Sequence, residues 1–307
     1  MISELKTFVT VVELKNFTKA AEVLNLSQPS VSIHIKNLEA QFEVKLINRS
    51  VKQKKIIITD QGYKLYARAK EILDLIDTTK HELKTETSSI RGSLKIGSSF
   101  TIGEYLLPKF IAYFTNKYPE IDIKVLMNNT AAVCKGIKEL SYDIGFIEGP
   151  PAFGNLNQHC FYTDEMVLAY SNTLTDISNI DAFANQCWIS REDGSGTREY
   201  LNMFLSQNHI IPKKLMILGS NYAIKEAIKN DLGITIISRL VVNEPSKKGE
   251  LNLFTLDDRF TRNFSYLTPK NVTQNEVTKV FLQELDDYYQ KSQFTQGQSE
   301  IYPQKKP

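Results

Sequence analysis

The chain has 307 residues, of which 42% are hydrophobic and 23% charged, a balance typical of globular proteins and enough length for two or three domains. It contains no run of about 18 apolar residues, so it is not expected to cross a membrane. Its start, MISELKTFVTVVELK, lacks the basic and apolar segments of an export signal, which favours a cytoplasmic protein. Cys134, Cys160 and Cys187 have neither a metal-binding nor a disulfide spacing, so no metal site is expected.

The net charge of +2 is unevenly distributed along the chain. Residues 1–65 hold ten Lys/Arg and six Asp/Glu, a balance of +4, whereas the rest of the chain holds 27 and 29, a balance of −2. The segment KLINRSVKQKK, residues 45–55, contains no acidic residue. Such a run is often only a solvated surface, but it also suits contact with a nucleic acid.

Three short helices are predicted at the start of the chain. Apolar residues recur at helical spacing over residues 3–14 and 18–24. The third helix begins after Ser27, a favourable N-cap, and has Pro29 in its first turn, where the missing N–H costs nothing.

Two strands and a long helix are predicted next. KLINR and KIIIT suit two short strands joined by the basic loop, and Thr59 is expected to cap the long helix. Apolar residues along this helix alternate spacings of four and three, a heptad-like seam that suits pairing of two subunits. The residues predicted for this dimerisation seam are Leu65, Ala69, Ile72, Ile76 and Leu83.

Strands alternate with helices after the polar, hinge-like segment 84–93. This alternation predicts open, mainly parallel sheets with helices on both faces, and about 200 residues suffice for two such sheets. Strands are predicted at 93–99, 121–127, 143–149, 166–170, 187–190, 214–218 and 233–238, and helices at 102–118, 131–140, 197–207 and 222–230. The tail, residues 291–307, lacks an apolar pattern and is predicted to be disordered.

The second and third helices, with their short joint, suggest a helix-turn-helix. A helix that enters a DNA major groove about 12 Å wide needs small or hydrogen-bonding residues on its outer face. The basic loop between the strands would then be a wing on the DNA backbone. The residues predicted to contact DNA are Ser27, Gln28, Pro29, Ser30, Ser32, Ile33, Lys36, Arg49 and Lys52. The plainer alternative is a helical hairpin packed inside a larger domain.

The stretch FTKAAEVLNLSQPSVSIHIKNLEAQFEVKLINR, followed by ITDQG, resembles the DNA-binding half of LysR-type transcriptional regulators. Twelve positions match that family's pattern: Ala20, Ala21, Leu24, Ser27, Gln28, Pro29, Ser32, Ile35, Leu38, Glu39, Arg49 and Gly62. Ile47-Asn48 and Ile33-His34 depart from it, which bears on the operator sequence rather than on how the helix docks.

The resemblance implies an α/β multi-domain protein: a winged helix-turn-helix (1–59), a linker helix with a hinge (60–91) and a two-lobed effector domain of periplasmic-binding-protein type (92–290). Lobe I would comprise about 92–163 and 267–290, and lobe II about 164–266. It further implies binding to double-stranded promoter DNA, a small-molecule effector, assembly into a dimer or tetramer, and contact with RNA polymerase. No cofactor is implied.

Two hydroxyl-rich stretches, GSSFTIGEYLLP and SREDGSGTREY, lie where strands are expected to end and helices to begin. Such positions in doubly wound sheets offer N–H and O–H donors to an anion. The predicted effector-binding residues are Ser98, Ser99, Thr101, Ser195, Gly196, Thr197, Arg198 and Asn221. Glu148 ends a nearby strand but ranks lower, because a carboxylate opposes an anion. An ordinary Ser/Thr helix cap and a glycine turn are the structural alternatives for the two stretches.

Both stretches also resemble the sulfur-assimilation branch of the family, which implies that a sulfur oxyanion such as sulfite or sulfate binds there. A small carboxylate would suit the same donors. Two other classes compete: a hydrolase that uses Ser195, and a solute-binding receptor. DGSGT lacks the nucleophile elbow of hydrolases, and a receptor would not need the first 90 residues, so no catalytic residue is predicted.

Overall fold

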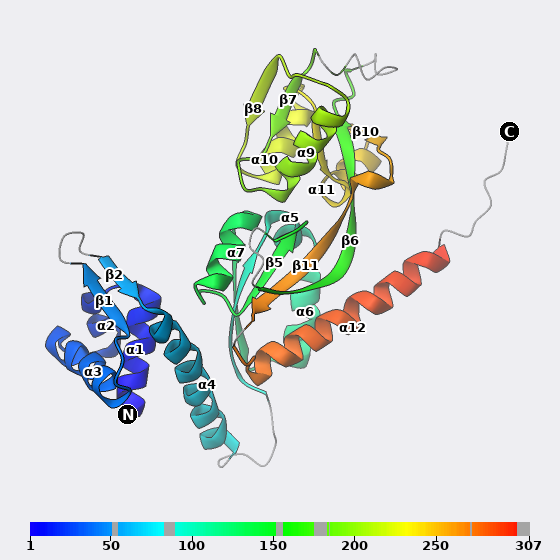
Figure 1. Ribbon diagram of the computed structural model, residues 1–307. Coiled ribbons are helices and arrows are strands. Elements are labelled where there is room, and N and C mark those ends of the chain that lie inside the picture. Colours follow the sequence, from blue (N-terminus) through cyan, green and yellow to red (C-terminus); the bar gives the residue numbers. More distant parts are fainter. Residues whose placement is uncertain are drawn as a thin grey trace.

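The computed structural model describes residues 1–50, 55–82, 90–151, 156–174, 183, 185–270 and 272–299. Figure 1 shows a small N-terminal domain, a long linker helix and two stacked lobes. None of the helices in these ranges combines the length and the apolar character needed to cross a membrane.

The N-terminal domain is a winged helix-turn-helix. Its elements are α1 (Ile2–Leu14), α2 (Phe17–Leu24), α3 (Gln28–Gln41), β1 (Ile47–Ser50) and β2 (Lys55–Ile58). Asn16 caps α2 by accepting a hydrogen bond from the Lys19 N–H, and Ser27 caps α3 by accepting one from the Ser30 N–H, as its sequence predicts. Phe8, from α1, is fully buried in the core between the helices.

The linker helix α4 (Asp60–Glu82) begins where the wing ends, because Thr59 accepts a hydrogen bond from the Gly62 N–H at 2.9 Å. A Cβ atom at Gly62 would lie 2.3 Å from the Leu46 carbonyl oxygen, so only glycine lets α4 approach the wing this closely. Tyr66 and Ala69 pack α4 on the helix-turn-helix core. The helix-turn-helix and the linker helix α4 therefore form one packed unit.

Lobe I is built on parallel strands, with β3 between β4 and β5. Its elements are β3 (Gly92–Ser98), α5 (Phe100–Tyr105), α6 (Leu107–Lys117), β4 (Ile121–Met127), α7 (Thr130–Lys138) and β5 (Ile144–Glu148), with α12 (Glu276–Ser299) from the end of the chain. Buried residues of α6 and α12 form the core on one face of the sheet, and those of α7 form the core on the other. The single helix predicted at 102–118 is interrupted at Leu106, ahead of Pro108.

Lobe II has the same layered plan. Its elements are β7 (Cys187–Ser190), α9 (Gly196–Gln207), β8 (Lys214–Ile217), α10 (Asn221–Lys229), β9 (Thr235–Ser238), α11 (Arg239–Lys247), β10 (Asn252–Thr255) and the short helix η1 (Asp258–Phe260). Trp188 and α9 pack on one face of the lobe II strands, and α10 and α11 pack on the other.

Two long antiparallel strands, β6 (Leu156–Tyr170) and β11 (Thr261–Pro269), join the lobes. β11 also pairs with β5 of lobe I, and β6 pairs with β9 and β10 of lobe II (Figure 1). The prediction of mainly parallel sheets is therefore wrong for these crossing strands. The strand predicted at 166–170 is only the end of β6, and β10, β11, α11 and α12 were not predicted.

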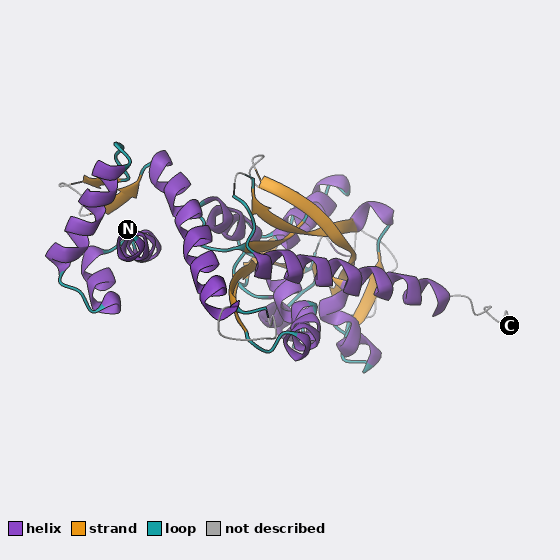
Figure 2. Ribbon diagram, turned by 90° about the horizontal axis from the view of Figure 1, so that it is seen from below, coloured by secondary structure: helices purple, strands orange, loops and turns teal. Residues whose placement is uncertain are grey.

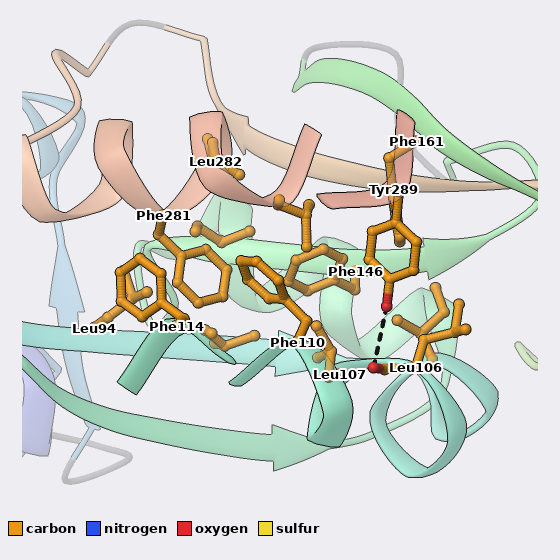
Figure 3. Close-up of a cluster of buried hydrophobic side chains, with 14 of the residues drawn as sticks. Leu94, Leu106, Leu107, Phe110, Phe114, Phe146, Phe161, Phe281, Leu282 and Tyr289 are labelled. Carbon is orange, nitrogen blue, oxygen red and sulfur yellow. Dashed lines mark hydrogen bonds between the residues drawn. The ribbon is translucent and has the colours of Figure 1, made fainter. Parts of the chain in front are cut away.

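α12 lies along lobe I, as Figure 1 and Figure 2 show from two sides. Phe281 lies edge-on to Phe110, with ring centroids 5.0 Å apart, and to Phe114, with centroids 4.9 Å apart (Figure 3). Tyr289 donates a hydrogen bond to the Leu106 carbonyl at the break between α5 and α6. Residues 291–299 of the tail predicted to be disordered are described as the last turns of α12, and 300–307 lie outside the described residues.

Charged pairs join the N-terminal unit to lobe I of the same chain. Lys70 of α4 bonds Asp143 at 2.7 Å, and Lys95 of β3 bonds Glu13 of α1 at 2.9 Å. The Asp143 carboxylate also accepts the backbone N–H of Lys95, so one acidic side chain contacts both α4 and β3.

Replacing Phe281 by alanine should destabilise the protein by about 3–5 kcal/mol, because the ring is fully buried and its removal leaves a cavity between α6 and α12. Phe254→Ala is the matched control, since that ring is 46% exposed on β10, and its cost should stay near 0.5 kcal/mol. Urea unfolding followed by far-ultraviolet circular dichroism measures both. Equal shifts would show that α12 is not part of the stable core.

Candidate functional site

The outer face of α3 has the features of a DNA-reading surface. Gln28, Ile33 and Lys36 are exposed and Ser32 is half-buried, whereas Val31, Ile35 and Leu38 of the same helix lie in the core. The Gln28 amide donates to the Ser32 hydroxyl at 3.0 Å, which orients it along the helix. Ile33 offers an apolar contact of the kind that suits a thymine methyl group.

Other predicted DNA-contact residues have a structural role or lack a described side chain. The Ser27 and Ser30 hydroxyls hydrogen-bond to each other at 2.7 Å at the start of α3, and Pro29 is exposed in the first turn. Arg49 lies on β1, but its side chain is outside the described residues, as is all of Lys52. The predicted DNA contacts remain predictions.

The apolar stripe that α4 exposes overlaps the predicted seam only in part. Ala69 is fully buried and Leu65 packs against the helix-turn-helix core, so neither can form the centre of a subunit contact. Ile72 is 44% exposed and Leu75, which the sequence prediction omitted, is 67% exposed. Ile76 is half-buried, and Leu83 lies outside the described residues.

The predicted effector residues converge where lobes I and II meet. Thr101 and Asn221, from opposite lobes, are both buried, and the Asn221 amide donates to the Thr101 hydroxyl at 3.0 Å. The Ala131 N–H of lobe I donates to the Gly194 carbonyl of lobe II at 3.2 Å. The two lobes are therefore in direct contact at this point.

Glu148, ranked low from the sequence, lies at the centre of this contact. Its Oε1 accepts the backbone N–H of Thr101 at 3.1 Å. Its Oε2 accepts the Thr197 hydroxyl at 3.1 Å and the Arg262 guanidinium at 2.6 Å. We call these three groups, the Thr101 N–H, the Thr197 hydroxyl and the Arg262 guanidinium, the interlobe donor set. It already holds a carboxylate.

Arg262 connects this carboxylate to the crossing strands. It lies on β11 and its Nε donates to Asp164 of β6 at 2.8 Å, while Asp164 also accepts the Ser238 hydroxyl of lobe II at 2.7 Å. All three side chains are buried. Sequence reasoning missed Arg262 and Asp164, because β11 and β6 carry several other polar residues and no local signal marks these two charges as buried.

Burial tends to raise the pKa of Glu148, but the charge of Arg262 and the hydrogen bonds from Thr101 hold that pKa below its usual range. The pKa of Asp164 is raised, because burial outweighs its contacts with Arg262 and Ser238. The two carboxylates raise the pKa of Arg262 despite its burial. Glu148 is thus the carboxylate that the site holds in its charged form.

A second guanidinium lies behind Asn221. Buried Arg191 donates to the Asn221 carbonyl oxygen at 2.9 Å, pairs with Glu192, and stacks over the Phe100 ring at 4.6 Å. Arg198, which was predicted for the site, instead pairs with Asp193 and donates to the Arg191 carbonyl. Of the two arginines, Arg191 is the one linked to the interlobe contact.

The serines of the two stretches differ in their bonding. Ser98 donates to the carbonyl of its neighbour, and Ser195 is the buried N-cap of α9. Ser99 is 2% exposed, and its hydroxyl makes no hydrogen bond to any described residue, although it lies near enough to Glu148 to help lower that pKa. A buried hydroxyl without a partner costs free energy, so Ser99 has a donor to offer a ligand.

Gly196 sets how closely the lobes approach. A Cβ at this position would lie 2.6 Å from the Glu148 carbonyl oxygen.

The described residues contain no group of three or more His, Cys, Asp or Glu side chains that could hold a metal ion.

Comparison with known proteins matches both halves of this architecture. Residues 2–63 match the family described as bacterial regulatory helix-turn-helix protein, lysR family, and residues 87–290 match the LysR substrate binding domain. The HTH-type transcriptional regulator CysL of Bacillus subtilis (strain 168) is 40% identical over 292 residues, which cover 93% of this chain and 97% of CysL.

Solved structures show the same fold. Full-length OxyR from Pseudomonas aeruginosa aligns with a TM-score of 0.68 at 18% identity, covering 93% of this chain and 94% of that one. The regulatory domain of CcmR from Synechocystis PCC6803, solved in complex with 2-PG, aligns with a TM-score of 0.58 at 25% identity, covering 65% of this chain and 98% of that domain.

Gln28→Ala should lower the preference for the cognate DNA site by about 1–3 kcal/mol, because an amide able to contact a base edge is removed from the exposed face of α3. Lys36→Ala is the matched change on that face and should weaken all DNA sequences alike, reducing the salt dependence by about one phosphate contact. Fluorescence anisotropy with specific and random duplexes at several salt concentrations measures both. Equal losses on the two duplexes in Gln28→Ala would exclude this residue from base readout.

Proposed function

This chain belongs to the LysR family of helix-turn-helix transcriptional regulators, and we propose that its effector is a small anion held between lobes I and II. It is a DNA-binding regulator rather than an enzyme. A sulfur oxyanion such as sulfite or sulfate is the first candidate, and a small carboxylate is the second. Such a regulator would act in the cytoplasm, where it reaches promoter DNA and RNA polymerase.

The observation that carries this proposal is the set of donors around one carboxylate, together with the unpartnered hydroxyl of Ser99. N–H, hydroxyl and guanidinium donors converge on anionic oxygens, and a buried site strengthens each of these hydrogen bonds. Arg191 adds a second buried positive charge behind Asn221. These groups suit oxygen atoms better than an apolar ligand.

The sulfur oxyanion is favoured by the resemblance of GSSFTIGEYLLP and SREDGSGTREY to the sulfur-assimilation branch. A tetrahedral or pyramidal oxyanion accepts hydrogen bonds from several directions, as donors from two facing lobes require. The complex of the CcmR domain with 2-PG supports the general point that a domain 25% identical to this one holds a ligand.

We further propose that two copies of the chain pair through the exposed stripe of α4 that includes Ile72 and Leu75. Two large apolar side chains on successive turns of one helix are costly to leave in water, and a second α4 would cover them. Pairing would place two α3 helices on one duplex, as successive half-sites require.

Ser99→Ala should weaken effector binding about tenfold or more, because one hydrogen bond to a charged ligand is worth roughly 1.5–3 kcal/mol. The change removes a buried hydroxyl that lies near Glu148 but makes no hydrogen bond of its own to a described residue, and circular dichroism checks that the fold is kept. Ser98→Ala is the control, since Ser98 bonds a neighbouring carbonyl instead. A thermal-shift screen of the full chain with sulfite, sulfate, thiosulfate, O-acetylserine and citrate selects the ligand, and calorimetry compares the variants. Unchanged affinity in Ser99→Ala would place the effector elsewhere.

Leu75→Glu should produce smaller assemblies that bind DNA weakly, because a charge would be buried against the symmetry-related helix. Ile211→Glu is the control, since Ile211 is 86% exposed but lies on lobe II, away from α4. Light scattering of the full chain measures mass directly. The same mass for Leu75→Glu and wild type would show that α4 contributes no subunit contact at this stripe.

A further inference from the structure

The interlobe donor set is fully engaged by a group of the protein itself. Glu148 accepts one hydrogen bond on Oε1 and two on Oε2, from lobe I, lobe II and a crossing strand in turn. A carboxylate has about four acceptor sites, so most of its capacity is used here. Within this cluster only the buried Ser99 hydroxyl has no hydrogen bond to a described residue.

An external anion cannot simply be added to this arrangement. Glu148 and Asp164 both bind the single guanidinium of Arg262, so the core of the cluster has no unpaired positive charge to offer an added anion. Like charges within a few ångströms repel strongly in a buried site, where solvent screens them poorly. The donors that an oxyanion needs are the ones that Glu148 holds.

We infer that the Glu148 carboxylate is a built-in anion that occupies the effector site of the ligand-free protein. An oxyanion effector then binds by displacing this carboxylate from the interlobe donor set. The inference rests on the proposed function, because it assumes that the effector is an anion. Glu148 would thereby set the affinity threshold of the site and favour ligands that accept hydrogen bonds more strongly than a carboxylate in the same place.

Displacement would also change the contact between the lobes. Arg262 donates to Glu148 of lobe I and to Asp164 of β6, so it joins lobe I to the crossing strands. When an effector replaces Glu148 on Arg262 and Thr197, the ligand takes over this connection and the backbone at the end of β5 is released from it. Binding is then coupled to the geometry of the hinge between the lobes.

Two substitutions of Glu148 test the inference in the full-length protein. Glu148→Gln keeps the shape of the side chain but removes its charge. Glu148→Ala removes the carboxylate, so that the interlobe donor set loses its shared acceptor. Both should bind sulfite or sulfate about tenfold more tightly than wild type, as measured by calorimetry, provided that circular dichroism shows a native fold. Formate, which has the chemistry of the missing side chain, should raise the melting temperature of Glu148→Ala and leave that of wild type unchanged.

Asp164→Asn is the matched control. It removes the same charge from the side of Arg262, but Asp164 bonds only Ser238 and Arg262 and not the Thr101 N–H or the Thr197 hydroxyl. Its gain in anion affinity should therefore be clearly smaller than that of Glu148→Gln. Equal gains would reduce the effect to net charge and overturn the inference.

The outcomes separate this inference from the proposed function. If wild type binds sulfite through Ser99 but Glu148→Ala and Glu148→Gln bind it no more tightly, Glu148 is not a competitor and the inference fails alone. If no screened anion binds wild type, yet formate stabilises Glu148→Ala, the built-in anion is supported and the proposed effector class fails. Weaker sulfite binding in a folded Glu148→Gln would make Glu148 a direct ligand of the effector and overturn displacement.

Discussion

The structure depends on the guanidinium of Arg262, which is buried with Glu148 on one side and Asp164 on the other. A buried guanidinium without partners would be prohibitively costly, and with both carboxylates in place it is stable only in this geometry. Because the three residues come from β11, β5 and β6, the same requirement fixes the crossing strands against lobe I.

Strand β3 connects the effector region to the N-terminal unit over a short distance. Ser99 follows its last residue, and Lys95 lies four residues earlier, where its side chain bonds Glu13 of α1 and its backbone N–H bonds Asp143. At about 3.3 Å per residue, these two points are roughly 13 Å apart along a rigid strand. Lys70 of the linker helix shares the same Asp143. The effector region and the helix-turn-helix domain are thus joined by polar contacts as well as by the chain.

The helix-turn-helix could be predicted from sequence because its determinants are local. The Ser27 cap, the Pro29 turn and the Thr59 cap each act within about one helical turn, and the structure confirms the elements they begin. The seam predicted on α4 includes Ala69, which the chain's own core covers, because spacing alone reveals an apolar stripe but not which part of it is buried within the chain. Ala69 is covered from within, and Leu75 is not.

The effector region, too, could be predicted from sequence only in part. Ser99, Thr101 and Thr197 were identifiable, since hydroxyls at strand ends are a local pattern. The pairing of Arg262 with Glu148 joins residues 114 positions apart, and the charge in each strand has no local explanation until the strands cross. The strands β6 and β11 were missed or shortened because polar residues, Asp164 and Arg262 among them, run through both strands. Only the contact between these two charges makes their burial possible.

Gly196 shows how a residue that looks like a simple turn element can define the site. At the start of α9 its hydrogen faces the Glu148 carbonyl, and any side chain would meet that oxygen at 2.6 Å. Because the next residue, Thr197, must reach the Glu148 carboxylate, the absence of a side chain at 196 lets α9 come close enough for its hydroxyl to donate. The glycine and the two hydroxyl-rich stretches are therefore parts of one constraint: α9 can bring the Thr197 hydroxyl to Glu148 because the two backbones nearly touch at Gly196.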